Sequence, residues 1–318
     1  MARRRPPLAF SQIRGLKVGH ASDRSGSTGV TVVRFDRSSP VVIDVRGGAS
    51  ATYDTGSLNL EATFGRRWAV FFSGGSLYGL DAARGIRTRL LEEGLGQHAF
   101  GTSALVLPIS GAAIFDLYRP RRPEVDYQEL GYRAARDASH APRVTAGAVG
   151  AGTGARVGKY LGRARAMAGG LGSAASRLVG GGALGVLVVV NAVGAIRDPS
   201  SGRYVAGARS RGGPVIPPTA DGLARAVATH TTLAMVVTDV TLSRPELLRL
   251  GMITSTGLAR AITPFHTTTD GDMVFAASTE RLARRRKERR PGELVDRLGM
   301  AAAELAVEAV LRAIPASP

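Results

Sequence analysis

The sequence of 318 residues contains no cysteine. Disulfide bonds, thiolate nucleophiles and metal sites with cysteine ligands are therefore excluded. The longest apolar stretch, residues 182–196, is too short for a membrane span and is interrupted by Asn191. The basic residues 1–7 are not followed by an apolar run of signal-peptide length. We therefore expect a soluble, cytoplasmic protein that does not enter a membrane.

Motifs for nucleotides and metals are also missing. The glycine-rich segment 147–159 is similar to a phosphate-binding loop, but Tyr160 follows Lys159 where a Walker loop has serine or threonine. No G-x-S-x-G motif occurs, and the five histidines lack the spacing of zinc ligands. We expect neither a cofactor nor a bound metal.

Acidic residues are scarce relative to basic ones, 25 against 42, which gives a net charge of +17. Much of the excess lies in the run from Arg281 to Arg290, which has no aromatic residue to stack on bases. Such a run is typical of a solvated loop in front of a helix, and contact with an anionic partner is the alternative. Nucleic acid is thus not the partner that we expect.

Apolar, β-branched runs recur along the chain and predict strands. They are residues 30–35, 41–45, 68–72, 104–109, 184–190, 233–237 and 273–277. Several are apolar throughout, which is typical of strands that are covered on both faces.

Helical periodicity extends from Leu77 to Leu90 and from Leu294 to Ala309, and Ser243 with Glu246 has the pattern of a capping box. Together with the strands, these patterns predict an α/β protein in which helices cover internal sheets. We expect a disordered basic tail at residues 1–12 and a single domain at residues 13–318. Residues 198–220, rich in glycine and proline, predict a long loop of the kind that is usually functional or disordered.

Polar residues lie at the ends of three predicted strands. Thr231 and Thr232 precede one strand, Asp270 and Asp272 precede another, and Asn191 ends a third. A side chain in such a place can face a cleft while the strand anchors it. Each also has an ordinary interpretation, because an Asp-Gly pair is a common hairpin turn, asparagine suits a turn or a cap, and threonine favours strands.

Several longer strings of residues accompany this constellation. They are residues 13–20, 44–48, 73–82, 150–154, 157–159, 169–172, 190–194, 231–233, 257–261 and 266–275. In these strings and their order the chain resembles the L-aminopeptidase/D-esterase (DmpA-like) family of N-terminal-nucleophile hydrolases, which includes β-aminopeptidases and the nylon-oligomer hydrolase. The similarity is greatest to the threonine branch, close to the nylon-oligomer hydrolase.

The resemblance implies a four-layer α-β-β-α sandwich, similar to ornithine acetyltransferase, that is made as one precursor and cuts itself. The cut would fall between His230 and Thr231 and would yield chains of residues 1–230 and 231–318. The resemblance assigns five site residues: Thr231 as nucleophile, Lys159 as active-site lysine, Asn191 as oxyanion asparagine, and Asp270 and Asp272 as paired acids.

The chemistry of a threonine at a chain start fits this assignment. A threonine hydroxyl is a weak nucleophile until a base removes its proton, and a free α-amine with a pKa of roughly 7.7–8 supplies that base beside the hydroxyl. Lys159 would lower that pKa further, the two aspartates would hold the ammonium and the hydroxyl, and Asn191 would donate to the oxyanion. The product would be an acyl-enzyme ester on Thr231, which water hydrolyses.

Two features leave alternatives open. His230 stands where the family commonly has asparagine or glycine, so it either assists the proton transfer of the cut or slows it. The adjacent Thr232 is a second candidate nucleophile, one residue away.

The function that we expect is that of an aminopeptidase-type amide hydrolase. It would act on a small amide or peptide and form a homo-oligomer, as family members usually do. An acyltransferase on the same scaffold and an unprocessed basic binding protein that uses the run from Arg281 to Arg290 are the alternatives.

Overall fold

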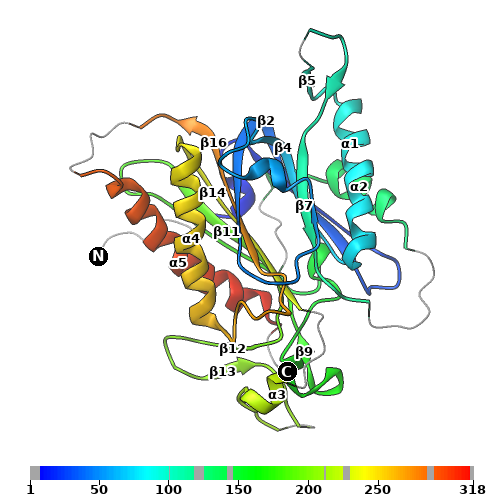
Figure 1. Cartoon of the computed structure of the whole chain (residues 1–318), viewed down its shortest axis with the longest axis vertical. Coiled ribbons are helices and arrows are strands. Elements are labelled where there is room, and N and C mark those ends of the chain that lie inside the picture. Colours follow the sequence, from blue (N-terminus) through cyan, green and yellow to red (C-terminus); the bar gives the residue numbers. More distant parts are fainter. Residues whose placement is uncertain are drawn as a thin grey trace.

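A computed structural model describes residues 8–99, 101–117, 125–141, 146–210, 213–224, 230–284 and 290–315. Within these ranges, helices lie on both sides of a large mixed sheet (Figure 1). The helices are α1 (Ala82–Glu92), α2 (Tyr127–Arg136), α3 (Ala220–Ala224), α4 (Arg244–Ala261) and α5 (Glu293–Ala313). The strands of the large sheet are β1 (Leu16–Ser22), β2 (Gly29–Val45), β3 (Thr52–Tyr53), β4 (Arg66–Ser73), β7 (Ile109–Ala113), β10 (Gly170–Arg177), β11 (Ala183–Asn191), β14 (Thr231–Val240) and β16 (Met273–Leu282).

Shorter elements connect these. The short strands are β5 (Gln97–His98), β6 (Leu105–Val106), β8 (Arg156–Val157), β9 (Met167–Ala168), β12 (Ala195–Arg197), β13 (Tyr204–Ala206) and β15 (Ile262–Thr263). The 3-10 turns are η1 (Phe10–Gln12), η2 (Gly56–Leu58), η3 (Ser76–Asp81), η4 (Gly150–Gly152), η5 (Lys159–Leu161) and η6 (Arg163–Arg165).

The large sheet has the strand order β10-β11-β14-β16-β2-β4-β7-β3, and β1 pairs with β2 beside this path. The sheet has two halves that meet at β2: β10, β11, β14 and β16 form one, and β1, β4, β7 and β3 form the other. The long strand β2 belongs to both halves, because residues 41–45 pair with β16 and residues 30–34 pair with β4. The two runs predicted as separate strands there are therefore one strand. Pairs along the sheet are antiparallel except β14 with β16 and β4 with β7, which are parallel.

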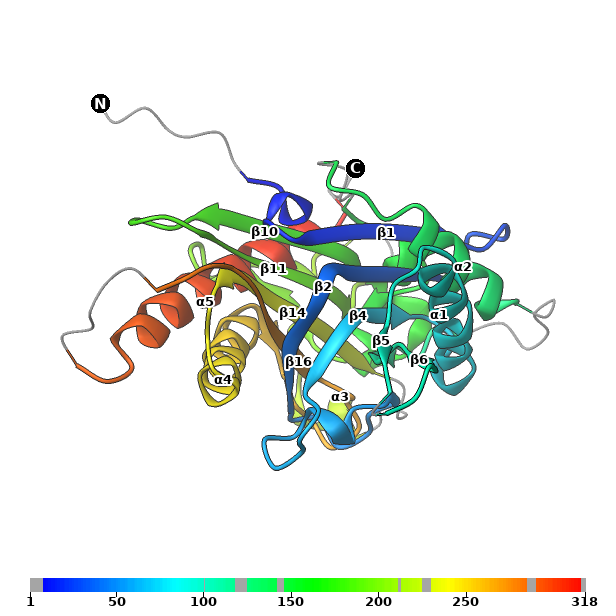
Figure 2. The same ribbon diagram turned by 90° about the horizontal axis from the view of Figure 1, so that it is seen from above.

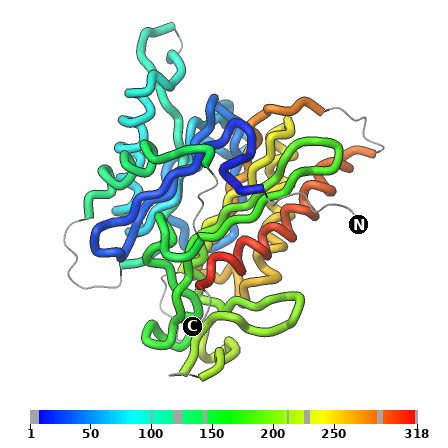
Figure 3. Tube along the Cα trace, turned by 180° about the vertical axis from the view of Figure 1, so that it is seen from behind, coloured from blue at the N-terminus to red at the C-terminus, as the bar shows by residue number. Residues whose placement is uncertain are grey.

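Helices cover the outer faces of both halves. α4 and α5 pack on β10, β11, β16 and β2, whereas α1 and α2 pack on β1, β2 and β7 (Figure 2). Seen from behind, α5 lies along the strands β10 and β11 (Figure 3). Every residue of β11 and β14 is buried, which confirms the prediction that the apolar runs are strands covered on both faces.

The inner faces of the two halves meet in an apolar core. It joins Val33 and Phe72 of one half to Leu233 and Phe275 of the other. The rings of Phe72 and Phe275 lie 5.8 Å apart between centroids, a usual spacing for aromatic pairs. Removing these side chains from water is the main favourable contribution to the packing of the two halves.

The helix predicted after Ser243 is α4, and its capping box is formed. The Glu246 carboxylate accepts the backbone N–H of Ser243 at 2.8 Å, and the Ser243 side chain accepts from the backbone of the first turn. Caps of this kind stabilise a helix by about 1 kcal/mol. α5 contains the last predicted helix and ends at Ala313, before Pro315.

Two expectations about elements are wrong in detail. Leu77 is 68 % exposed, because residues 76–81 form the 3-10 turn η3 and the α-helix begins only at Ala82. The strand predicted at residues 104–109 is divided into β6 and β7, with Pro108 between them. Proline has no N–H to donate to a strand ladder, which accounts for the interruption.

The expected disordered tail at residues 1–12 is also wrong for its second part. Phe10 is only 1 % exposed, and Leu8 forms a bridge with Ala175. Both apolar side chains pack in the core between the halves, which gives this segment a reason to be ordered. Residues 1–7 lie outside the described ranges.

The predicted loop at residues 198–220 is tied to the body by Tyr160. The Tyr160 hydroxyl donates to the carbonyl of Ile216 and accepts the N–H of Ala208 at 3.1 Å. The loop also contains β13, which pairs with β12, and residues 211 and 212 of it lie outside the described ranges. This segment therefore packs beside the turn that carries Lys159. Among the helices of the described part of the chain, none is both long and apolar enough to cross a membrane.

Candidate active site

The order of the strands brings the predicted site residues to one edge of the sheet. Thr231 is the first residue of β14 and pairs with Asn191, the last residue of the antiparallel strand β11. β16 runs parallel to β14, so the turn with Asp270 and Asp272 that precedes β16 lies beside the start of β14. Strand direction alone thus collects residues that are up to 81 positions apart in numbering, from 191 to 272.

The peptide bond between His230 and Thr231 lies at the centre of this edge. The backbone N–H of Gly271 donates to the carbonyl oxygen of His230 at 2.9 Å, and the Thr231 hydroxyl donates to the same oxygen. A Cβ atom on Gly271 would lie 2.7 Å from the Thr231 hydroxyl oxygen. Glycine is therefore required at position 271 for the hydroxyl to lie where it does.

Asp272 holds the backbone on either side of the site. Its Oδ1 atom accepts the N–H of Thr232 at 2.6 Å, and its Oδ2 atom accepts the N–H of His266 at 2.9 Å. Its own carbonyl accepts the N–H groups of Arg46 and Gly47, both at 3.0 Å. The carboxylate is completely buried, and these bonds fix both its position and that of the start of β14.

The two carboxylate oxygens of Asp270 differ in their hydrogen bonds. Its Oδ2 atom accepts the hydroxyl of Thr267 at 2.5 Å and the N–H of the same residue at 3.2 Å. Its Oδ1 atom is buried and has no hydrogen-bond partner among the described residues. Burial and the negative charge of Asp272 raise the pKa of Asp270 to about 6, although the Thr267 bonds and the charge of Lys159 oppose the shift.

Lys159 follows the turn that ends at Gly158 and points to the end of β11. Its Nζ atom donates to the carbonyl oxygen of Asn191 at 2.7 Å and to Oδ1 of the same residue at 3.0 Å. Burial lowers the pKa of Lys159 to about 7, and the negative charges of Asp270, Asp272 and Asp116 limit the fall. A buried lysine with this pKa exchanges protons near neutral pH.

Asn191 is held from both ends of its amide. Oδ1 accepts the N–H of Arg156 at 3.0 Å as well as Lys159, and Nδ2 donates to the carbonyl of Phe115 at 3.1 Å. The amide therefore links the lysine turn to the chain around Phe115. Its assignment as an oxyanion donor stays a prediction.

Three contributors to this site were not identified from the sequence. Gly271 contributes a backbone N–H, Asp116 contributes charge near Lys159 from a buried position, and His266 contacts Asp272. The Asp-Gly-Asp string was the available signal for Gly271. The described residues contain no group of three or more acidic or histidine side chains placed to hold a metal ion.

The loop that follows β2 packs against the acidic turn. The N–H of Ala49 donates to the carbonyl of Asp270 at 2.8 Å, and a Cβ atom on Gly47 would lie 2.3 Å from the backbone nitrogen of Asp272. This close approach requires glycine at position 47 and couples the position of the loop to that of both acids.

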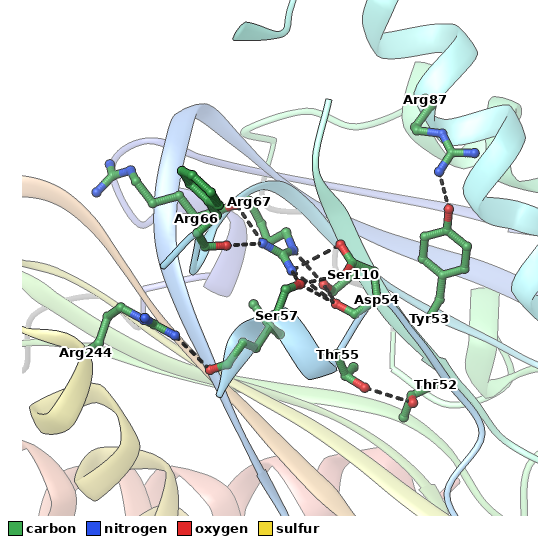
Figure 4. A network of polar contacts seen from close by, with 12 residues as sticks. Thr52, Tyr53, Asp54, Thr55, Ser57, Arg66, Arg67, Arg87, Ser110 and Arg244 are labelled. Atoms are coloured by element: carbon green, nitrogen blue, oxygen red, sulfur yellow. Dashed lines mark hydrogen bonds and ion pairs between the residues drawn. The ribbon is translucent and has the colours of Figure 1, made fainter. Parts of the chain in front are cut away.

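Farther along the chain, the segment that follows this loop is held by Arg67, whose side chain is 1 % exposed (Figure 4). The guanidinium donates to the carbonyl of Asp54 at 3.1 Å, to the carbonyl of Phe64 at 3.0 Å, to Ser110 at 2.6 Å and to the hydroxyl of Ser57. It also lies 3.1 Å from the Asp54 carboxylate. Arg67 thus fixes residues 54–57 against β4 and β7.

The predicted basic run is only partly described. Its described arginines form ion pairs, because Arg281 lies 3.7 Å from Asp36, Arg284 pairs with Glu246, and Arg290 lies 2.7 Å from Asp296. Residues 285–289 lie outside the described ranges.

Comparison with known proteins gives one family. Residues 9–318 match the model of peptidase family S58. An uncharacterized aminopeptidase of Mycobacterium leprae is 35 % identical over 295 residues, which cover 86 % of this chain and 79 % of the relative. The 6-aminohexanoate-oligomer endohydrolase of Paenarthrobacter ureafaciens is 31 % identical over 282 residues, which cover 84 % of this chain and 74 % of that enzyme.

Solved structures show the same fold. A β-aminopeptidase of a Burkholderia species superposes with a TM-score of 0.67 at 20 % identity, over 96 % of this chain and 87 % of that one. The L-aminopeptidase D-Ala-esterase/amidase of Ochrobactrum anthropi, described as a variant of the Ntn hydrolase fold, gives a TM-score of 0.67 at 20 % identity. It is covered over 85 % of its length, and this chain over 96 %.

Proposed function

Because the chain belongs to peptidase family S58 and is a hydrolase of peptide or amide bonds, we propose that it cuts itself before Thr231 and then uses Thr231 as an N-terminal nucleophile. The single observation that carries this proposal is the contact of the Thr231 hydroxyl with the carbonyl group of His230. Gly271 donates to that carbonyl oxygen at 2.9 Å, which is where negative charge develops during attack.

The self-cleavage has two steps. In the first, the Thr231 oxygen adds to the carbonyl carbon of His230, the C–N bond breaks, and the Thr231 nitrogen takes the proton that the hydroxyl loses. The product is an ester between His230 and the Thr231 side chain. In the second, water hydrolyses the ester, which leaves a carboxylate on His230 and a free amine and a free hydroxyl on Thr231.

Groups that exchange protons near neutral pH surround this bond. The pKa of Asp270 is raised to about 6 and that of Lys159 is lowered to about 7, so both take up and release protons at working pH. The buried Oδ1 atom of Asp270 also offers an acceptor for the ammonium that the cut creates. These properties suit the precursor, which has no α-amine at Thr231.

In the mature protein, the new α-amine of Thr231 takes the proton of its own hydroxyl. The hydroxyl attacks the carbonyl of a bound amide or ester, the leaving amine or alcohol takes the proton, and the acyl group stays on Thr231 until water removes it. Substrates would be peptides or other small amides. The similarity to the 6-aminohexanoate-oligomer endohydrolase favours short amides as the first to be tested.

The arrangement of layers supports this proposal. Helices α4 and α5, the two halves of the sheet, and helices α1 and α2 follow one another, with an apolar core between each adjacent pair. We interpret this order as the four-layer α-β-β-α sandwich of self-processing hydrolases.

Three variants test the proposal. Thr231→Val keeps the size and branching of the side chain and removes the hydroxyl, so it should remain a single chain. Thr231→Ser keeps a hydroxyl and should still be cut. Thr232→Val is the matched control one residue along, and it should be cut like the wild type; a Thr231→Val protein that is still cut, or a Thr232→Val protein that is not, would move the nucleophile to Thr232 or refute the mechanism.

A further inference from the structure

Asp272 is the end of a chain of polar contacts that begins inside α4. The hydroxyl of Ser255 lies 2.8 Å from Nε2 of His266, and Nδ1 of His266 lies 3.3 Å from Oδ2 of Asp272. The other carboxylate oxygen of Asp272 accepts the N–H of Thr232 at 2.6 Å. A serine, a histidine and an aspartate thus lead to the peptide group between Thr231 and Thr232.

The partners of His266 select one form of its ring. A carboxylate only accepts hydrogen bonds, so the nitrogen that faces Asp272, Nδ1, must carry a proton for an attractive contact. In the neutral ring Nε2 is then the acceptor, and the Ser255 hydroxyl is placed to donate to it. Asp272 therefore favours the ring form with its proton on Nδ1, and Ser255, which can donate to Nε2, keeps the ring in this orientation. The 3.3 Å contact of Nδ1 with Oδ2 of Asp272 is electrostatic, because it lacks the alignment of a hydrogen bond.

The serine of this group is not placed to act as a nucleophile. Ser255 is buried within α4 and only 3 % exposed, so a substrate does not reach its hydroxyl. His266, by contrast, contacts Asp272 twice, through its ring and through its backbone N–H at 2.9 Å on the same oxygen. The contacts lead from the helix toward the nucleophile and not toward solvent.

We propose that His266 is a positioning residue for the reaction at Thr231: its ring, oriented by Ser255, holds Asp272 so that the other oxygen of Asp272 fixes the Thr231–Thr232 peptide group. The inference rests on the proposed function, because it gives His266 a role in the chemistry at Thr231. None of these contacts uses the atoms of the His230–Thr231 peptide bond, so in this proposal they serve both self-cleavage and hydrolysis of a substrate.

The backbone of His266 explains which residues can replace it. Its φ is +62°, in the left-handed region that β-branched and bulky residues avoid and that asparagine tolerates. His266→Asn keeps a side-chain N–H near the position of Nδ1, whereas His266→Gly accepts the φ value but removes the donor. The pair therefore separates the side-chain contact with Asp272 from backbone strain.

The test measures the rate of self-cleavage and, after cleavage is complete, kcat and KM on an amino-acid para-nitroanilide and on a 6-aminohexanoate oligomer. We expect His266→Gly to lower the cleavage rate and kcat by roughly 10- to 100-fold with little change in KM, because a displaced nucleophile loses rate rather than binding. His266→Asn should recover most of the loss. The inference is overturned if the glycine variant stays within about twofold of the wild type, or if asparagine performs no better than glycine.

A second pair of variants tests the role of Ser255. Ser255→Ala should lower kcat, whereas Thr256→Ala removes an exposed hydroxyl from the next position of the same helix and should leave kcat unchanged. Equal rates for both alanine variants and the wild type would remove Ser255 from the proposal.

Failure of the inference can be told apart from failure of the proposed function. If wild-type protein never gains a chain start at Thr231, the proposed function fails and the roles of His266 and Ser255 fail with it. If the wild type is cut there and the His266 variants behave like it, only the further inference fails.

Discussion

Thr231 and Asn191 lie directly opposite each other, as the first residue of β14 and the last residue of the antiparallel strand β11. Paired strands lie about 4.8 Å apart, so this register fixes how far Thr231 is from the Asn191 side chain, which accepts from Lys159. β14 pairs with β11 from Thr231 to Thr238 and with β16 on its other side. A break in the chain before Thr231 would therefore leave the new chain start anchored in the sheet.

Gly271→Ala tests the close packing around the Thr231 hydroxyl. The added Cβ atom would lie 2.7 Å from the Thr231 hydroxyl oxygen and 2.8 Å from the carbonyl of Ala49, so the hydroxyl must move. We expect self-cleavage to slow by roughly 100-fold, measured as the fraction of cut chain over time on a denaturing gel. Gly56→Ala is the control, because its Cβ atom meets nothing within 4 Å. Equal cleavage rates in both variants would contradict the account.

Asp270→Asn tests the electrostatic cost of the site. The folded protein raises the pKa of Asp270 from 3.8 to about 6, so it binds an extra proton between these pH values, and its stability falls as pH rises through that window. Asparagine removes the charge, so the variant should be more stable at pH 7 by about 2 kcal/mol and similar to its parent near pH 3.5. Urea unfolding in the Thr231→Val background, where both proteins stay single chains, measures the difference. A variant that is less stable at pH 7 would show that the Asp270 charge stabilises the fold.

Lys159→Met tests the buried lysine. The folded protein lowers the pKa of Lys159 from 10.5 to about 7, so the unfolded chain binds more protons over that range, and stability should rise with pH from about 7 to about 10. Methionine removes the titrating group and with it this rise, which unfolding experiments at several pH values detect. Self-cleavage at pH 8 should fall by roughly 100-fold, because a group that transfers protons is lost. Lys17→Met, at a partly exposed position on β1, should keep both properties.

Arg67→Met tests how far Arg67 stabilises the fold by holding residues 54–57. Methionine removes the hydrogen bonds that this buried guanidinium makes to Ser110 and to the part-buried carbonyl groups of Asp54 and Phe64, so we expect a loss of about 3 kcal/mol in the free energy of unfolding. Arg66→Met removes an exposed ion pair with Glu280 and should cost at most about 1 kcal/mol. Thermal or urea unfolding compares the two, and equal losses would refute the role given to Arg67.

Strand ends leave a pattern in the sequence, and this pattern singled out several of the candidate site residues. Thr231, Asp270 and Asn191 are polar residues at the ends of apolar runs, and such runs follow from burial on both faces. Which ends meet depends on strand order and direction, which no local pattern contains. His266 and Asp116 were missed for this reason, since each reaches the site through tertiary contacts alone.

Two elements, β10 and α2, were not predicted from the sequence, and they differ in how strongly their residues indicate them. β10 consists largely of glycine, serine and alanine, so it lacks the β-branched residues by which strands are detected. α2, in contrast, carried a signal, because Asp126 caps its first turn and Leu130 and Ala134 share its buried face. The donor at Gly271 belongs to the backbone, and a backbone group has no signature of its own in a sequence.

The most direct test of the central claim is the mass and N-terminal sequence of freshly purified wild-type protein. The account predicts two chains, residues 1–230 and 231–318, with the second beginning Thr-Thr-Leu and the two remaining associated under native conditions. A single intact chain of 33.1 kDa, or a second start at another residue, would contradict it.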